Sequence, residues 1–184
     1  MTPEEKFDAA IKSAVNDREA LIKFMGNYTD AQASWEPGAG EWSIAQGAEH
    51  ILLTDTFARQ GLLKTLSDAK ENKVWDNAPD NPEKFTIDQL RRREQGAVPS
   101  PDHLLPKEGR LLSAMIPLLL PSREETGAAL APYRGHELER LIPPSTRYGE
   151  LNVYDRMHYM GIHDALHMEQ MERVTKAKGF PSRE

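Results

Sequence analysis

The sequence predicts an all-α protein: a four-helix bundle of the up-down-down-up type, with a long crossover between its second and third helices. Three observations support this fold class. Long segments repeat apolar residues at steps of three and four, which is the period of an amphipathic helix. Ser or Thr is repeatedly followed three residues later by Glu or Gln, as at helix starts. No segment alternates apolar and polar residues as a strand does. The length of 184 residues fits one domain over 1–184.

The first helix is expected to begin at Pro3, because Thr2 and Glu5 have the spacing of a capping box and proline suits the first helical position. Its apolar positions fall on one face: Phe7, Ile11, Ala14, Leu21, Met25 and Tyr28. We expect this helix to end near Asp30, before a turn segment that contains Pro37-Gly38.

The second helix is predicted over about 43–67, with a capping box formed by Ser43 and Gln46. Its apolar residues occupy much of its circumference: Ile44, Ile51, Leu52, Leu53, Phe57, Leu62 and Leu63. A helix of this kind is expected to be buried on several sides. His50 lies among these residues.

Residues 68–108 differ from the rest because prolines interrupt them repeatedly, at positions 79, 82, 99, 101 and 106. A connection of this length inside a compact domain is unusual and is often functional. We therefore expect a Pro-rich connection, or a lid over one end of the bundle, with a short helix over Thr86–Arg93.

The third helix contains Pro117 and Pro121, which predict a kink or two separate helical pieces. Ser122 and Glu125 then have capping-box spacing, and the apolar pattern continues to about Leu141.

The fourth helix is expected to begin near Asn152, with Asp155 at its third position, and to end just before Gly179. One face of it steps by three and four residues through Val153, Met157, Met160, His163, His167, Met171 and Val174. Two histidines thus interrupt an apolar, core-facing surface. An imidazole without a partner is costly to bury, so something in the interior has to satisfy both.

His163 and His167 are four residues apart, which on a helix places their Cβ atoms about 5–6 Å from each other. Two imidazoles in that arrangement can bind one divalent metal. His50 is the best third ligand, because it also lies within an apolar helical surface. Three imidazoles with open positions are typical of a reactive site, whereas structural zinc usually has four protein ligands. The alternative is that a core hydrogen bond satisfies each histidine separately.

Two other polar residues are candidates for lining the pocket: Gln46, one turn before His50, and Tyr159, one turn before His163. Packing in the core or at the rim is the alternative for both. Asp164 lies about 100° round the helix from His163. It is expected either to support a metal ligand or to lie at the surface. A zincin would have Glu at this position, so the sequence does not match that class of metalloenzyme.

The composition narrows the classes of partner. A formal net charge of −6 argues against broad nucleic-acid binding, and no apolar run is long enough to span a membrane. The absence of cysteine excludes disulfides, protein thiolate nucleophiles and cysteine-based zinc sites. The acidic first residues lack the pattern of a secretory signal, so we expect a cytoplasmic protein. Dimerisation through the bundle helices is compatible with the pattern.

The segment Trp42-Ser43-Ile44-Ala45-Gln46, followed by Glu49-His50, resembles the second-helix motif of the DinB/YfiT superfamily. Tyr148–Asp155, leading into His163–Gln170, resembles its last-helix motif. The resemblance extends from Trp42 to Val174. It implies a four-helix bundle with a long crossover and a histidine triad that binds a divalent metal, often zinc or nickel. The matching positions are His50, His163 and His167.

Three functions follow as hypotheses. The first is a metal-dependent S-transferase that adds a low-molecular-weight thiol to a small-molecule electrophile. The second keeps the metal but uses water to hydrolyse an amide or ester. The third is a non-enzymatic metal-binding or interaction protein. The resemblance implies thiol-cofactor S-transferases, a thiol-dependent isomerase and proposed metal-dependent hydrolases, and also includes members without a known reaction.

Overall fold

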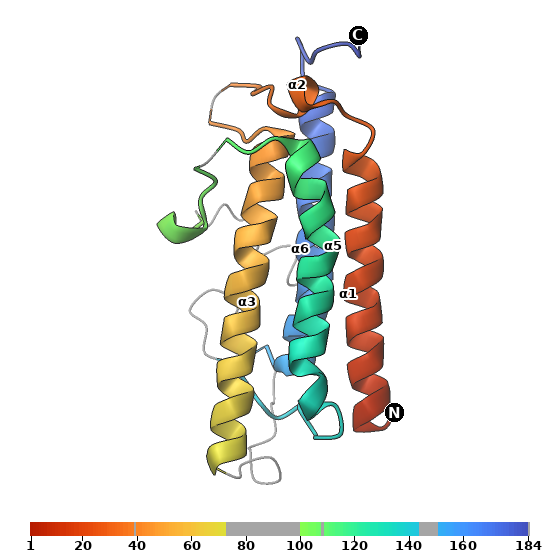
Figure 1. Ribbon diagram of the computed structural model, residues 1–184, viewed down its shortest axis with the longest axis vertical. Helices are drawn as coiled ribbons and strands as arrows, with labels where there is room; N and C mark the ends of the chain where they lie inside the picture. Colours follow the sequence, from red (N-terminus) through yellow and green to blue (C-terminus); the bar gives the residue numbers. More distant parts are fainter. Residues whose placement is uncertain (39, 73–99, 108, 144–150, 184) are drawn as a thin grey trace.

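Four long helices lie side by side along the long axis of the molecule in the computed structural model (Figure 1). They are α1 (Pro3–Met25), α3 (Ile44–Asn72), α5 (Leu112–Leu130) and α6 (Val153–Thr175). In chain order they run up, down, down and up, as predicted, so that α3 and α5 are parallel (Figure 1). The structure describes residues 1–38, 40–72, 100–107, 109–143 and 151–183. The short helix expected over 86–93 lies outside these residues.

Helix α1 begins as predicted: the Thr2 hydroxyl accepts from the Glu5 N–H at 3.2 Å, and the Glu5 carboxylate accepts from the Thr2 N–H at 2.9 Å. Its predicted end near Asp30 is wrong, because α1 stops at Met25 and a separate short helix, α2 (Asp30–Ala33), follows. Thr29 and Gln32 form a further capping box that starts α2.

Helix α3 also begins at its predicted capping box, in which the Ser43 N–H donates to Gln46 Oε1 at 2.8 Å. It continues to Asn72, five residues beyond the predicted end. Its first two turns are buried almost all round, but farther along only one face is covered. The prediction that this helix is buried on several sides is therefore wrong at Phe57, which is 54% exposed. Phe57 is exposed because α3 packs against α5 and α6 through its other face.

Helix α5 passes through Pro117 and Pro121 without a break, so two separate pieces do not form. Both prolines are exposed, and water can satisfy the carbonyls that lose a helical partner on that side. The predicted capping box at Ser122 is absent, and Glu125 instead pairs with Arg59 at 3.1 Å. The predicted extension to Leu141 is also wrong. The helix ends at Leu130 and a 3-10 turn, η2 (Ala131–Tyr133), follows.

A carboxylate caps the start of α5, and a side-chain amide caps the start of α6. Leu111, the residue before α5, has no side chain that can cap this helix. Asp30, at the start of α2, takes that role by accepting from the Ser113 N–H at 2.8 Å and from the Ser113 hydroxyl at 2.6 Å. Asn152 caps α6, as predicted, by accepting from the Asp155 N–H at 2.9 Å. Gly179 does not end α6, which stops at Thr175. It has a φ of +94° in the turn beyond.

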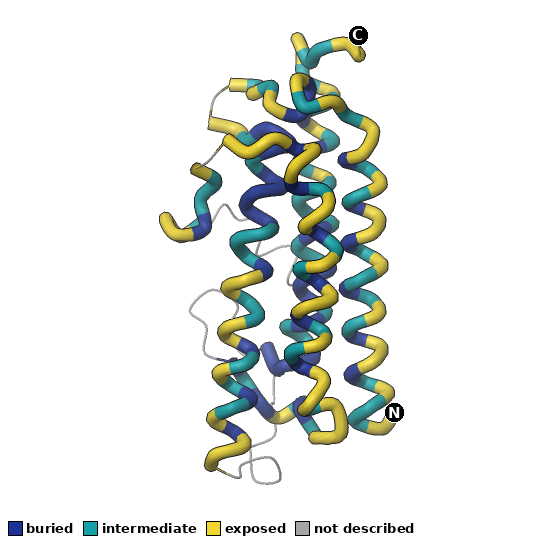
Figure 2. Tube along the Cα trace, viewed as in Figure 1, coloured by how far each residue is buried: buried dark blue, intermediate teal, exposed yellow. Residues whose placement is uncertain are grey.

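The core contains an apolar cluster toward each end of the bundle. One cluster includes Phe7, Leu62, Leu66, Leu130, Leu138 and Met157, and the other includes Leu21, Met25, Ile44, Ile51, Leu119 and Met171. The buried positions fall along the inner faces of the helices (Figure 2). Within the described residues, no helix is both long enough and apolar enough to cross a membrane.

Four charged side chains, one from each long helix, lie in the same interior. We call Arg18, Asp55, Arg123 and Asp164 the Arg–Asp tetrad; none is more than 4% exposed. Arg18 donates to both oxygens of Asp164, at 2.8 and 2.9 Å, and to both of Asp55, at 2.8 and 3.1 Å. Arg123 Nη2 reaches Asp55 at 3.1 Å and Asp164 at 3.0 Å. The tetrad thus connects all four helices.

Candidate metal centre

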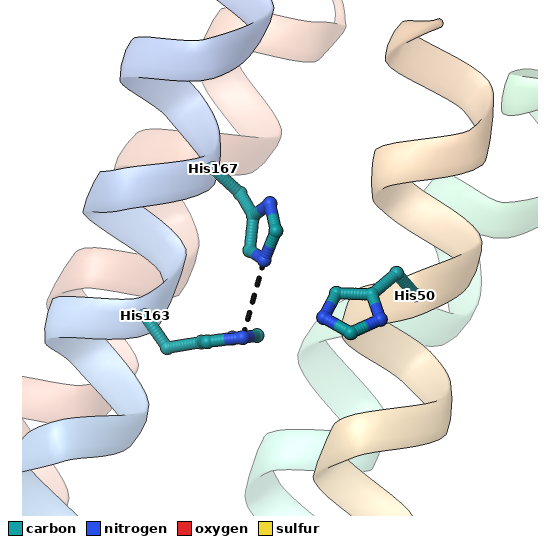
Figure 3. Close-up of side chains that lie close together, drawn as sticks. All are labelled: His50, His163 and His167. Atoms are coloured by element: carbon teal, nitrogen blue, oxygen red, sulfur yellow. Dashed lines mark hydrogen bonds between the residues drawn. The ribbon is translucent and has the colours of Figure 1, made fainter. Parts of the chain in front are cut away.

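Three histidines meet between two helices, where α3 faces α6 (Figure 3). His50 comes from the second turn of α3, and His163 and His167 come from successive turns of α6. One ring nitrogen from each lies within 4.8 Å of the other two. His163 Nε2 and His167 Nε2 are 3.1 Å apart. The structure therefore brings together the three histidines that the sequence selected.

A glycine allows α3 and α6 to approach beside these rings. Gly47 lies three residues before His50, and a Cβ atom at Gly47 would lie 2.7 Å from Met171 Cε. Met171 is itself one turn beyond His167. The small residue thus leaves room for an α6 side chain next to the histidines.

Hydrogen bonds set the orientation of two of the three rings. His50 Nδ1 lies 2.7 Å from the carbonyl oxygen of Leu104, which can only accept, so Nδ1 carries the proton. His167 Nδ1 lies 3.0 Å from Gln170 Oε1, which likewise accepts. In a neutral imidazole the other nitrogen, Nε2, then holds a lone pair. Partners of this kind fix the tautomer of metal-binding histidines.

The donor set fits a divalent transition metal. The 3.1 Å contact between His163 and His167 needs a proton on His163 Nε2 when His167 Nε2 accepts. In the other neutral tautomer of His163 that proton is on Nδ1, and three nitrogen lone pairs then converge. In a tetrahedral zinc site with bonds of about 2.0–2.1 Å, ligand nitrogens are roughly 3.3 Å apart, close to the observed contact.

Two aromatic side chains pack against the histidine rings. The Trp42 ring centroid is 4.8 Å from that of His50, and the ring stacks on His167 at 6.2 Å with an interplanar angle of 15°. Tyr159 packs beside His163 at 6.0 Å. His50 is buried, whereas His167 is half-buried, so the cluster lies near the edge of the bundle core.

The two predicted pocket residues occupy different places. Tyr159 is 6% exposed and packs beside the His163 ring. Gln46 uses its side chain in the helix cap with Ser43 and donates to Glu36 Oε1 at 2.8 Å. The contacts in the described part of the chain do not bring Gln46 to the histidines.

Acidic side chains beside the histidines in sequence are directed elsewhere. Asp164 is fully buried in the Arg–Asp tetrad, so the surface position that the sequence allowed is wrong. Glu49 accepts from the Lys107 N–H at 3.0 Å. Among the residues that the structure describes, no Asp or Glu joins the three histidines as a potential ligand.

Neither hydrogen-bond partner of the His50 and His167 rings was predicted from the sequence. Gln170 follows His167 by three residues on the same helix, so helical spacing could have identified it. Leu104 contributes a main-chain carbonyl from 54 residues away in sequence, which no residue pattern reveals.

Two comparisons with known proteins found a match. The family model of the DinB superfamily matches residues 14–171, a range that contains all three histidines. A similar protein is the uncharacterized protein YuaE of Bacillus subtilis (strain 168), which is 25% identical over 147 residues, covering 79% of this chain and 85% of the relative. No solved structure matches the chain.

Proposed function

The chain belongs to the DinB superfamily, and from this premise we propose that it is a metal-dependent enzyme in which His50, His163 and His167 hold one divalent transition-metal ion, zinc or nickel. The observation that carries the proposal is the convergence of three ring nitrogens within 4.8 Å of one another. The hydrogen bonds at Nδ1 of His50 and His167 support it, because they leave Nε2 available.

The surroundings favour a reactive centre over a structural one. Three protein ligands leave coordination positions open, whereas structural zinc sites usually have four. His167 is half-buried and not fully enclosed, so the cluster is not sealed inside the core. The bundle interior already contains two apolar clusters and the Arg–Asp tetrad, so its cohesion does not depend on a metal at one edge.

We propose further that the reaction transfers a low-molecular-weight thiol to a small electrophile. A divalent metal with open positions lowers the pKa of a thiol placed there, so that a thiolate exists at neutral pH. The chain has no cysteine, so the thiol comes from a co-substrate. Its sulfur forms a bond to the electrophilic carbon, the leaving group departs with the bonding electrons, and the thiol proton is released. Trp42 and Tyr159 supply apolar walls beside the ligand rings.

Hydrolysis of an amide or ester fits the site less well. Activation of water is helped by a general base, and the neighbouring acids Glu49 and Asp164 hydrogen-bond to Lys107 and to the tetrad arginines. A thiol has a lower pKa than water and needs less help. A purely metal-binding or interaction protein is the remaining alternative.

The test supplies zinc- or nickel-loaded protein with an alkyl halide or epoxide and a panel of cellular thiols, and measures loss of free thiol. We expect metal-dependent consumption with at least one thiol, absent in His50→Ala and retained in His158→Ala, a histidine of α6 outside the cluster. Cleavage of esters or amides without thiol consumption would favour the hydrolase. Metal binding with neither reaction, together with a sharp loss of Tm in His50→Ala, would favour the non-enzymatic alternative.

A further inference from the structure

The end of the crossover packs against α3 beside the histidine cluster. We call residues 101–107, which include the 3-10 turn η1 (Asp102–Leu104), the docked segment. The Leu104 carbonyl accepts from His50 Nδ1 at 2.7 Å, and the Lys107 N–H donates to Glu49 Oε1 at 3.0 Å. Two adjacent residues of α3 therefore hold two points of one segment.

Further contacts fix the segment along the helix. Leu104 is only 8% exposed, and the His103 ring lies 5.1 Å from the Phe57 ring, two turns beyond His50 on α3. The exposed Phe57 thus receives a contact from the segment. Figure 1 shows η1 beside the upper half of α3. The docked segment has an apolar anchor as well as two hydrogen bonds.

The hydrogen bond from His50 has a direct effect on metal binding. A carbonyl oxygen accepts but cannot donate, so the docked segment keeps the His50 proton on Nδ1 and the lone pair on Nε2. When the segment leaves, the ring loses this restraint and can rotate or adopt the other tautomer. Supporting hydrogen bonds of this kind typically change metal affinity by about 10–100-fold.

We propose that the docked segment is a working part of the metal centre, with Glu49 as the positioning residue that holds it in place. The proposal rests on the metal centre proposed above. Glu49 touches neither the metal nor a substrate, and it acts by keeping the Leu104 carbonyl on His50. Because coupling between two binding events is reciprocal, metal binding also stabilises docking by the same factor.

The first test measures hydrogen exchange of the Lys107 amide by NMR, without and with saturating zinc. This N–H is the donor to Glu49, so its exchange reports on docking. We expect zinc to slow it about 10-fold or more in the wild type. His167→Ala is the control, because it removes a proposed metal ligand on α6 and leaves His50, Glu49 and the docked segment unchanged in sequence. In that variant zinc should leave the exchange unchanged.

The second test measures zinc affinity by competition with a chelating dye. Glu49→Ala should weaken zinc binding about 10-fold or more. Glu49→Gln keeps an acceptor oxygen and should stay within a few-fold of the wild type. Glu71→Ala removes the same charge from the far, exposed end of α3 and should have no effect.

The outcomes separate the two proposals. If the wild type binds no zinc, the metal centre itself is refuted, and the coupling is refuted with it. If the wild type binds zinc but the Lys107 amide exchanges at the same rate with and without it, only the coupling is refuted. Unchanged zinc affinity in Glu49→Ala, with a freely exchanging Lys107 amide, would refute the coupling in the same way.

Discussion

The Arg–Asp tetrad and the histidine cluster meet at adjacent residues, Asp164 and His163, yet they solve the problem of buried polar groups differently. In the tetrad, two arginines face two aspartates, and every carboxylate oxygen accepts at least one hydrogen bond from a guanidinium group. In the histidine cluster, three imidazoles face one another, with one ring nitrogen of each within 4.8 Å of the other two. The carboxylates of the tetrad are therefore satisfied within the chain, whereas the cluster is suited to an added cation.

The charges of the tetrad depend on each other. Burial alone lowers the pKa of Arg18, but Asp164 and Asp55 outweigh that effect and raise the pKa above its ordinary value. Arg18 therefore stays charged at all pH values at which the protein is folded. Removing one member leaves an uncompensated charge in the interior, which is far more costly than losing a surface ion pair.

The largest effect is expected for Arg18→Met, which keeps most of the side-chain volume but leaves two buried carboxylates with one arginine. We expect the free energy of unfolding to fall by about 3–5 kcal/mol, measured by urea denaturation. Arg134→Met is the control, because Arg134 pairs with Asp8 at the exposed surface and should change stability little. A loss below about 1 kcal/mol for Arg18→Met would mean that the tetrad is not an interdependent unit.

Zinc should stabilise the folded protein by binding to the histidine cluster, with no substitution in the chain. At a free concentration of 100 times Kd, binding to the folded state adds about 2.7 kcal/mol to the free energy of unfolding. The measurement is Tm with zinc and after its removal by a chelator. His163→Ala should abolish the difference between the two. A zinc effect of equal size in that variant would place the metal elsewhere.

The close approach of α1 and α6 should support the tetrad but not the histidines. A Cβ atom at Gly161 would lie 2.1 Å from Asp17 Oδ2 and 3.1 Å from Asp17 Cβ, so Gly161→Ala should push these helices apart. We expect a loss of about 1–3 kcal/mol by urea denaturation, with zinc affinity within a few-fold of the wild type.

Gly61→Ala provides the matched control for that substitution. Gly61 is also within a helix, but among the described residues no atom from outside its own stretch of helix backbone lies within 4 Å of an added Cβ. This variant should gain about 0.5–1 kcal/mol from helix propensity alone. Equal effects of the two alanines would show that α1 and α6 can separate without cost.

A smaller effect than that of Gly161→Ala is expected for Asp30, a carboxylate outside both regions. Hydrogen bonds from the Ser113 hydroxyl and N–H hold the pKa of Asp30 below its ordinary value. The stabilisation is therefore present above the unfolded-state pKa, about 3.9, and is lost as the pH falls through the lower folded-state pKa. Asp30→Ala should cost about 1 kcal/mol at neutral pH and less at pH 3. A cost that does not decrease with acid would contradict the assignment.

Local signals explain which parts of the fold were predictable. The starts of α1, α3 and α6 depend on side chains within three residues of the helix start, so the sequence alone identified them. Whether α5 continues through Pro117 and Pro121 depends on whether the two prolines face solvent, and the packing of α1 and α3 against α5 decides that. For the same reason, the sequence could not show that Asp30 caps α5 from another helix.

The two polar regions differ in the same respect. His163 and His167 reveal themselves by their spacing on one helix, and His50 by its apolar surroundings. Arg18 also gave a signal, since it continues the three-and-four stepping between Ala14 and Leu21, but its partners lie on three other helices. A charge on an apolar face predicts that a partner exists, and only the packing of the helices identifies the partner.

Calorimetric titration of tag-free, metal-stripped protein with zinc measures directly whether the histidine cluster holds one metal ion. We expect the wild type and His158→Ala each to bind one equivalent, and the triple variant His50→Ala, His163→Ala, His167→Ala to bind none. Absence of binding in the wild type, or an undiminished equivalent in the triple variant, would contradict this expectation.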